Sequence, residues 1–430
     1  MGRLPGTVPE RHALSGHIRR HDRRASHHRP LPPAGARGND TATRPQSKGT
    51  QMRVAIVTGD YHKPGQTFVN RHIEHLFGGN TCVVANGFNG VNPFDKHVFA
   101  HRQIRRPFPE NLASPFMKAV QRRRYGSSRL PWGARRKALE TFLRDQEIAL
   151  ILAEFGTEAL TVIDTAEAMG LPMFTYFRGT DASYSLRQPT RVAGYARMFP
   201  RLTGVVAVSQ FLMDNLAAHG LTHPNSHVIP SGVDVRRFQP REKVPGSFLA
   251  VGRMIEKKAP QVSLRAFAKA TANRPDARLT FIGDGPERAP CEALAAELDV
   301  REKVIFTGEQ AHEVVRDHLE RTAVFLQHSV PSSNGTTEGL PTAIQEALAC
   351  GCIVISTRHA GIPEAIDHGE NGWLCDEHDE AAYTDLVARS LTADTDAMSR
   401  AARATAETRF DNAVLLTKLE TIFRESVPAG

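Results

Sequence analysis

The sequence predicts an α/β protein with two open parallel sheets in succession. From Met52 onward, short runs rich in β-branched residues alternate with segments of helical periodicity, which is typical of βαβ units. The alternation stops once, in the polar stretch 236–246, and then resumes in the same way. A chain of 430 residues with 40% apolar residues is long enough for two such domains, each with its own core.

The first series predicts five strands before the polar stretch. They are expected at residues 54–58, 81–85, 149–153, 173–177 and 204–208. Ser209 is a suitable N-cap for a helix that continues to about His219. A further strand that closes on a turn is expected over residues 228–234.

The second series repeats the same alternation. Its strands are expected at residues 247–251, 278–282, 303–307, 323–327 and 353–357, and its helices at 259–271, 288–298, 312–319 and 342–350. Open parallel sheets bind ligands beyond the carboxyl ends of their strands. The pattern therefore favours a two-domain enzyme with its site in the cleft between the domains.

The net charge of +8 is concentrated at the amino terminus. Residues 1–51 carry ten Lys or Arg and three Asp or Glu, whereas residues 52–430 carry 44 basic and 43 acidic side chains. With six prolines and few large apolar groups, residues 1–51 are expected to form a disordered basic tail. Such a tail is either an arm that binds phosphates or a spacer without a chemical role.

A second basic segment lies inside the first series. Residues 102–137 hold eleven Lys or Arg and one acid, a net charge of +10, with apolar and aromatic side chains interleaved. One interpretation is a solvated basic helix. The other is a surface that meets anionic lipid headgroups or a phosphorylated acceptor. Nucleic acid is not expected as a partner, because no recognition motif accompanies the charge.

Neither a membrane span nor a disulfide framework is predicted. No apolar run approaches the roughly 18–20 residues that span a bilayer. The five cysteines are scattered and odd in number, and the Cys350-Gly-Cys352 pair lacks a second pair of metal ligands. A cytoplasmic protein is expected, and no metal site is predicted.

The most informative stretch is residues 329–364. Glu338 and Glu346 stand eight positions apart, and Pro341 between them suits the first position of a helix. The backbone amides of Gly339 and Leu340 would then lie at a helix N-terminus, which favours a phosphate. Two carboxylates beside an anion pocket match a nucleotide sugar, which presents a ribose diol, a diphosphate and a hexose diol.

This stretch resembles the E-x7-E signature of the retaining GT-B glycosyltransferases of family four. The form E-G-L-P…E, with H-S-V before it and R-H-A-G-I-P-E after it, is most similar to bacterial exopolysaccharide enzymes of the colanic-acid type. By this resemblance, Glu338 holds the transferred sugar and Glu346 holds the ribose. Gly339, Leu340 and Pro341 are then donor-binding residues.

The resemblance continues along the chain in matching order. The segment 252–258 is similar to the family's G-R-x4-K element, which assigns Arg253 and Lys258 to the donor diphosphate. The glycine that usually follows the lysine is Ala259 here. Two cations after a strand can offset the negative charge of a diphosphate leaving group.

Three further positions are implied as donor contacts. Gly65 lies in the loop after the first strand, Gly283 lies in a G-D-G-P turn, and Phe306 lies in a V-I-F-T-G strand whose backbone contacts the base in relatives. Glycine in the first loop would let the backbone approach a substrate closely.

One position departs from the family pattern. The loop 177–181 corresponds to H-G-x-D in many relatives, where the histidine contacts the sugar, but this chain has Arg178. Arg178 is assigned to the catalytic set, where it would bind the diphosphate or an acidic sugar. The alternative is a structural arginine paired with Asp181 across the turn. Asp181 itself is assigned to the acceptor side.

The resemblance implies a GT-B fold of two Rossmann-like domains that face each other across a cleft. The expected parts are the tail (1–51), an acceptor-side domain (52–240), a nucleotide-sugar domain (241–408) and a C-terminal helix crossing back to the first domain (409–430). A Pro-x-Gly-Val-Asp element at residues 230–234 resembles the hinge of the family.

The implied activity is metal-independent transfer of a hexose from a nucleoside-diphosphate sugar with retention. No cofactor is expected besides the sugar nucleotide, such as a UDP- or GDP-hexose. The expected acceptor is a saccharide or a polyprenyl-diphosphate-linked saccharide in surface polysaccharide synthesis, at the inner face of the plasma membrane. The alternatives are another sugar-nucleotide reaction, such as epimerisation, and a basic binding module without catalysis.

Overall fold

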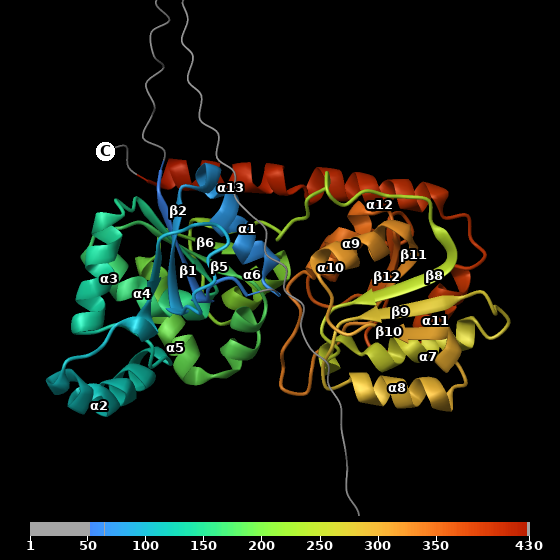
Figure 1. Ribbon diagram of the computed structural model, residues 1–430, viewed down its shortest axis with the longest axis horizontal. Helices are drawn as coiled ribbons and strands as arrows, with labels where there is room; N and C mark the ends of the chain where they lie inside the picture. The colour runs from blue at the N-terminus through green and yellow to red at the C-terminus, as the bar shows by residue number, and fades with distance from the viewer. Residues whose placement is uncertain (1–51, 64, 428–430) are drawn as a thin grey trace, which may run out of the picture. The chain divides into compact units, whose positions relative to one another are not determined.

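The computed structural model describes residues 52–63 and 65–427, so the expectations for the tail, residues 1–51, lie outside the described residues. The chain forms two fully parallel sheets (Figure 1). Their strand orders are β3-β2-β1-β4-β5-β6-β7 and β10-β9-β8-β11-β12-β13. In both, the chain runs from the centre to one edge and then returns to build the other half, which is the Rossmann order. The predicted fold class is confirmed.

The first sheet contains all five of the expected strands. Its strands are β1 (Val54–Asp60), β2 (Thr81–Gly87), β3 (Val98–Ala100), β4 (Leu150–Glu154), β5 (Met173–Phe177), β6 (Gly204–Ala207) and β7 (Ser226–Val228). The central strands are buried apolar runs, as expected where helices cover both faces of a sheet. The strand expected at residues 228–234 is wrong, because β7 ends at Val228, Pro230 lacks a donor N–H and Gly232 turns the chain at φ 76°.

In the described part of the first half there are six α-helices. They are α1 (Thr67–His75), α2 (Phe108–Tyr125), α3 (Ala134–Asp145), α4 (Gly156–Ala168), α5 (Pro189–Met198) and α6 (Gln210–Ala218). Of these, α2 packs on α5. The predicted cap of α6 is confirmed, since the Ser209 hydroxyl accepts a hydrogen bond from the Leu212 N–H.

The second sheet follows the prediction within a few residues. Its strands are β8 (Val244–Val251), β9 (Arg278–Ile282), β10 (Val304–Phe306), β11 (Thr322–Gln327), β12 (Ile353–Thr357) and β13 (Gly372–Cys375). Its helices are α7 (Pro260–Ala270), α8 (Arg288–Glu297), α9 (His312–Arg321), α10 (Thr342–Ala349) and α11 (Glu380–Arg389). The edge strand β13 and the helix α11 were not predicted.

The last two helices join the two halves. Helix α12 (Asp396–Arg409) packs on α10, and α13 (Asn412–Ser426) continues to the first half, as Figure 1 shows. The rings of Phe423 and Phe174 lie 4.8 Å apart, and the Phe77 N–H donates to Glu420 Oε1 at 2.6 Å. The expected crossover helix is therefore confirmed. Across residues 52–63 and 65–427, no helix is long and apolar enough to cross a membrane.

Candidate active site

The segment between β11 and α10 forms the centre of the site, where the strands of the second sheet end. Helix α10 begins at Thr342, as the predicted range 342–350 does, but Pro341 is its N-cap with φ −60° and not its first residue. A shift of one residue is within the usual uncertainty of helix ends. Gly339 and Leu340 therefore lie at the helix entrance, as the sequence predicts.

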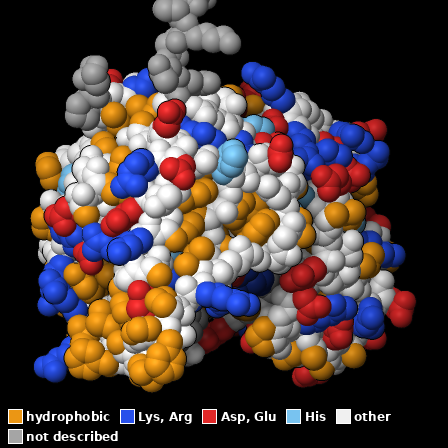
Figure 2. Space-filling model, turned by 60° about the vertical axis from the view of Figure 1, so that its left-hand side comes forward, with side chains coloured by type: hydrophobic (Ala, Val, Ile, Leu, Met, Phe, Trp, Pro, Cys, Tyr) orange, Lys and Arg blue, Asp and Glu red, His pale blue; other side chains and the backbone are white. Residues whose placement is uncertain are grey.

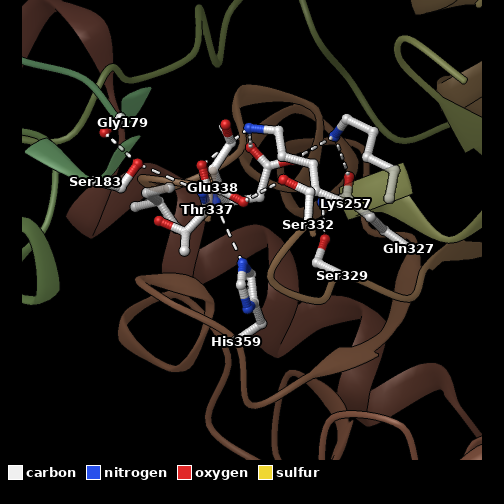
Figure 3. Close-up of polar contacts among 12 residues, drawn as sticks. Gly179, Ser183, Lys257, Gln327, Ser329, Ser332, Thr337, Glu338 and His359 are labelled. Carbon is white, nitrogen blue, oxygen red and sulfur yellow. Dashed lines mark hydrogen bonds and ion pairs between the residues drawn. The ribbon is translucent and has the colours of Figure 1, made fainter. Parts of the chain in front are cut away.

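Glu338 is buried between two lysines (Figure 3). Its Oε2 lies 3.1 Å from Lys257 Nζ, and its Oε1 lies 3.2 Å from Lys258 Nζ. Lys257 also donates to the Thr337 carbonyl at 3.0 Å, and Lys258 donates to Gln327 Oε1 at 3.2 Å. The structure thus brings the predicted Glu338 and Lys258 together.

Lys257 was missed by the sequence interpretation, although it lies as close to Glu338 as Lys258 does. The G-R-x4-K element of the family specifies only one lysine, which is Lys258 here. The only sign of a second lysine in the site was that the residue before Lys258 is also a lysine. A short helical turn, Glu256–Lys258, after β8 directs both ammonium groups to the same carboxylate.

The two lysines decide the charge of Glu338. Burial alone would raise the pKa of Glu338, but Lys258 and Lys257 outweigh burial and lower that pKa to about 2. Burial lowers the pKa of Lys258, against the opposing effect of Glu338. The centre therefore holds one ionised carboxylate and two ammonium groups, which can bind sugar hydroxyls and diphosphate oxygens respectively.

A histidine positions the backbone of Glu338. The Glu338 N–H donates to His359 Nε2 at 3.2 Å, and His359 Nδ1 lies 2.6 Å from Glu377 Oε1. Since Nε2 accepts, the Nδ1 atom carries the proton and the ring is neutral, and burial lowers the pKa of His359 accordingly. His359 stands in the R-H-A-G-I-P-E part of the resemblance, but no role was predicted for it.

Glycines allow the loop after β5 to lie directly against the entrance of α10. A Cβ on Gly339 would come within 2.3 Å of the Arg178 carbonyl oxygen, and one on Gly361 within 2.3 Å of the Gly339 carbonyl oxygen. The Thr337 N–H also donates to Ser183 Oγ at 3.4 Å. Only glycine permits these approaches, so the loop at residues 178–183 lies beside Glu338.

Arg178 is engaged inside the first half of the chain. Its Nε and Nη2 donate to Glu154 Oε2 at 3.0 and 2.7 Å, and its Nη1 donates to Ser231 Oγ at 3.0 Å. The guanidinium also lies over the Tyr176 ring at 3.7 Å and the Phe68 ring at 4.3 Å. If Arg178 is a structural arginine, as the alternative holds, its ion-pair partner is therefore Glu154. The place of Arg178 in the catalytic set stays a prediction.

The alternative pairing of Arg178 with Asp181 across the turn involves only the Arg178 backbone N–H, because the guanidinium is held by Glu154. The Asp181 carboxylate accepts hydrogen bonds from three backbone N–H groups, those of Gly156 at 2.9 Å and of Arg178 and Gly179 at 3.0 Å each. Burial raises the pKa of Asp181, although these N–H groups lower it. Asp181 fixes the shape of the loop, and its contact with an acceptor stays a prediction.

Glu346 lies on helix α10, and Arg253 lies in the loop after β8. Glu346 Oε1 is 3.0 Å from His312 Nε2, on the first turn of α9. Arg253 is exposed and forms no hydrogen bond or ion pair with any residue that the structure describes. Its guanidinium is therefore free to bind a phosphate.

The three remaining donor positions have different surroundings. A Cβ on Gly283 would come within 2.0 Å of the Gly252 carbonyl oxygen, so close loop packing requires this glycine. Phe306 stacks on Phe281 with centroids 5.2 Å apart. Gly65 is exposed, and a Cβ there would meet nothing within 4 Å. Their contacts with a donor stay predictions.

Comparison with known proteins gives matches over both halves. Residues 92–237 match the model of Glycosyltransferase Family 4, and residues 234–408 match that of Glycosyl transferases group 1. The amylovoran biosynthesis glycosyltransferase of Erwinia amylovora is 29% identical over 254 residues, which are 58% of this chain and 62% of that protein. A colanic acid biosynthesis glycosyltransferase of Escherichia coli is 28% identical over 285 residues, or 64% of this chain and 70% of that protein. The matched region thus spans a little under two thirds of the first relative.

Solved structures give the same fold at lower identity. A glycosyltransferase of Rickettsia africae has a TM-score of 0.69 and 16% identity, over 89% of this chain and all of that one. An Anabaena protein solved with UDP has a TM-score of 0.68 and 15% identity, over 87% of this chain and all of that one. With both family models matched along residues 92–408 and two Rossmann-like sheets in this arrangement, the chain belongs to the GT-B glycosyltransferases of family four.

Proposed function

We propose that this protein transfers a hexose from a nucleoside-diphosphate sugar to a saccharide, free or linked to a polyprenyl diphosphate, with retention at the anomeric carbon. The observation that carries the proposal is Glu338 held buried and ionised between Lys257 and Lys258. The names of the relatives support a role in exopolysaccharide synthesis, and the neighbour solved with UDP supports a nucleotide donor.

The proposed reaction assigns a role to each charged group. Negative charge develops on the departing diphosphate in the transition state, and Lys257, Lys258 and Arg253 are the cations that would stabilise it. The N–H groups at the entrance of α10 would add a favourable helix dipole. Glu338 would accept hydrogen bonds from the sugar hydroxyls, and Glu346 from the ribose.

Under this proposal the reaction takes place in the cytoplasm. Sugar nucleotides are cytoplasmic metabolites, so the reaction would take place there, at the inner face of the membrane if the acceptor is lipid-linked. The nucleotide that binds would narrow the donor to one nucleotide class, and comparison of sugars within that class would identify the hexose.

The test is product analysis with a sugar nucleotide labelled at the anomeric carbon and a saccharide acceptor. The expected product is a new glycoside whose anomeric configuration equals that of the donor, as read by NMR. Inversion at that carbon would contradict retention, and an epimerised sugar nucleotide without a new glycoside would contradict transfer.

A further inference from the structure

Helix α2 exposes an apolar stripe to the surroundings. Phe108 is 76% exposed, Leu112 70%, Phe116 70% and Val120 40%. Their spacing of four residues places them on one face of the helix, over about 18 Å of its length. Figure 2 shows hydrophobic side chains gathered in this way at the lower left, where Figure 1 places α2.

The face of α2 opposite the stripe packs on the rest of the protein. This inner face is unusually polar for a helix face that is turned to the protein. Glu110, Ser114, Gln121 and Tyr125 lie on this inner face together with one aliphatic residue, Met117, and all five are half-buried or buried. Glu110 Oε1 accepts from the Ala134 N–H at 2.8 Å, and Gln121 Nε2 donates to the Leu130 carbonyl at 3.0 Å. A surface helix normally buries its apolar stripe. Here the polar anchors hold the helix with that stripe outward.

Cations flank the stripe. Lys118 and the run Arg122–Arg124 are exposed on the same helix, and they belong to the segment 102–137 with its net charge of +10. A second copy of this chain is a poor partner for the stripe, because a two-fold contact would bring two such basic segments together. An anionic surface complements both the stripe and the charge.

We infer that α2 docks the protein on an anionic lipid bilayer. The apolar side chains from Phe108 to Val120 enter the boundary between headgroups and acyl chains, while Lys118 and the arginines contact lipid phosphates. The helix lies in the interface and does not span it. This inference concerns a surface away from the residues of the candidate active site, so it does not rest on the proposed reaction.

The experiment measures binding of the full chain to sedimenting vesicles. Vesicles containing phosphatidylglycerol are expected to bind the protein, and vesicles of phosphatidylcholine alone much less. The double substitution Leu112→Ser/Phe116→Ser and the charge reversal Lys118→Glu/Arg123→Glu are each expected to lower binding by at least about ten-fold. The matched control Val244→Ser/Val414→Ser changes residues that are 52% and 55% exposed elsewhere, and should bind as the unchanged protein does.

Further readouts separate the alternatives. Thermal stabilisation by the sugar nucleotide should be the same in both α2 variants, which shows that they fold and that the donor site is intact. Inorganic phosphate at the concentration of the lipid phosphate should not displace the vesicles, because it offers no apolar phase. Unchanged vesicle binding in both variants would overturn the inference and assign binding to other cations, such as those of residues 1–51. A dimer in light scattering that Leu112→Ser/Phe116→Ser dissolves would also overturn it, in favour of self-association.

Discussion

Glu338 is the residue on which most of the proposed chemistry depends. Replacing it with Gln keeps a hydrogen-bond acceptor but removes the charge between Lys257 and Lys258. We expect Glu338→Gln to lower the transfer rate at saturating donor by about 100-fold, the usual effect of removing one preorganised polar group from an active site. The exposed Glu370 provides the control, since Glu370→Gln should be as active as the unchanged protein. Full activity in Glu338→Gln would refute the role assigned to it.

The same residue predicts a pH dependence of stability. The pKa of Glu338 is lowered from 4.5 to about 2 in the folded protein, so its ion pairs stabilise the fold fully above about pH 4.5. That contribution is lost as the pH falls through 4.5 towards 2. Chemical denaturation at several pH values should show this loss in the unchanged protein and a flatter profile in Glu338→Gln. Parallel profiles for the two proteins would contradict the assignment.

At the scale of elements, the contact between the loop after β5 and the entrance of α10 depends on Gly339. A Cβ there would clash with the Arg178 carbonyl oxygen, and backbone cannot move aside as a flexible side chain can. We expect Gly339→Ala to reduce transfer by at least about ten-fold while circular dichroism stays unchanged, because positioning errors of an ångström lower rates strongly. Gly59→Ala also adds a methyl group, but Gly59 does not have a positive φ and its Cβ would meet Glu158 Oε1 only at an ordinary 3.7 Å, so it serves as the control for activity. Equal activity of the two variants would contradict the steric argument.

Helix α13 is the second element with a definite prediction. Phe423 is fully buried against Phe174, so Phe423→Ala leaves a cavity in the first half of the chain. The expected loss in the free energy of unfolding is about 3–5 kcal/mol, measured by urea denaturation. The exposed Val414 on the same helix is the control, since Val414→Ala should change stability by less than about 0.5 kcal/mol. A small effect of Phe423→Ala would show that α13 contributes little to the fold.

For the whole molecule, donor binding should raise the melting temperature, because a ligand that binds only the folded state stabilises it by mass action. At about one hundred times the Kd, the gain is about 2.7 kcal/mol. A thermal-shift screen of UDP- and GDP-hexoses should identify the donor, and Glu346→Ala should reduce the shift that the best ligand gives. Glu370→Ala is the control. An unreduced shift in Glu346→Ala would contradict the proposed contact with the ribose.

The sequence alone was sufficient for the fold class and for most of its elements. Strands such as β5 and β9 are short buried runs bounded by turn residues, and this local pattern predicts their ends closely. The edge strands β3, β7 and β13 were missed, because each holds at most one β-branched residue, whereas the equally short β6 and β10 hold two. The motif spacing also brought Glu338 and Lys258 into one predicted site, because both follow strands whose carboxyl ends meet at one edge of a sheet.

Only the tertiary structure decided which partners the charged residues have. Lys257 and His359 contact Glu338, and Arg178 pairs with Glu154. These partners either come from segments that lie far apart in the chain or stand at positions that the motif leaves unspecified. Likewise, the charge count of residues 102–137 was visible in the sequence, but the outward direction of the apolar stripe on α2 was not. Local sequence fixes periodicity and caps, whereas pairing and exposure depend on which distant surfaces are brought together when the two sheets and the crossover helix pack.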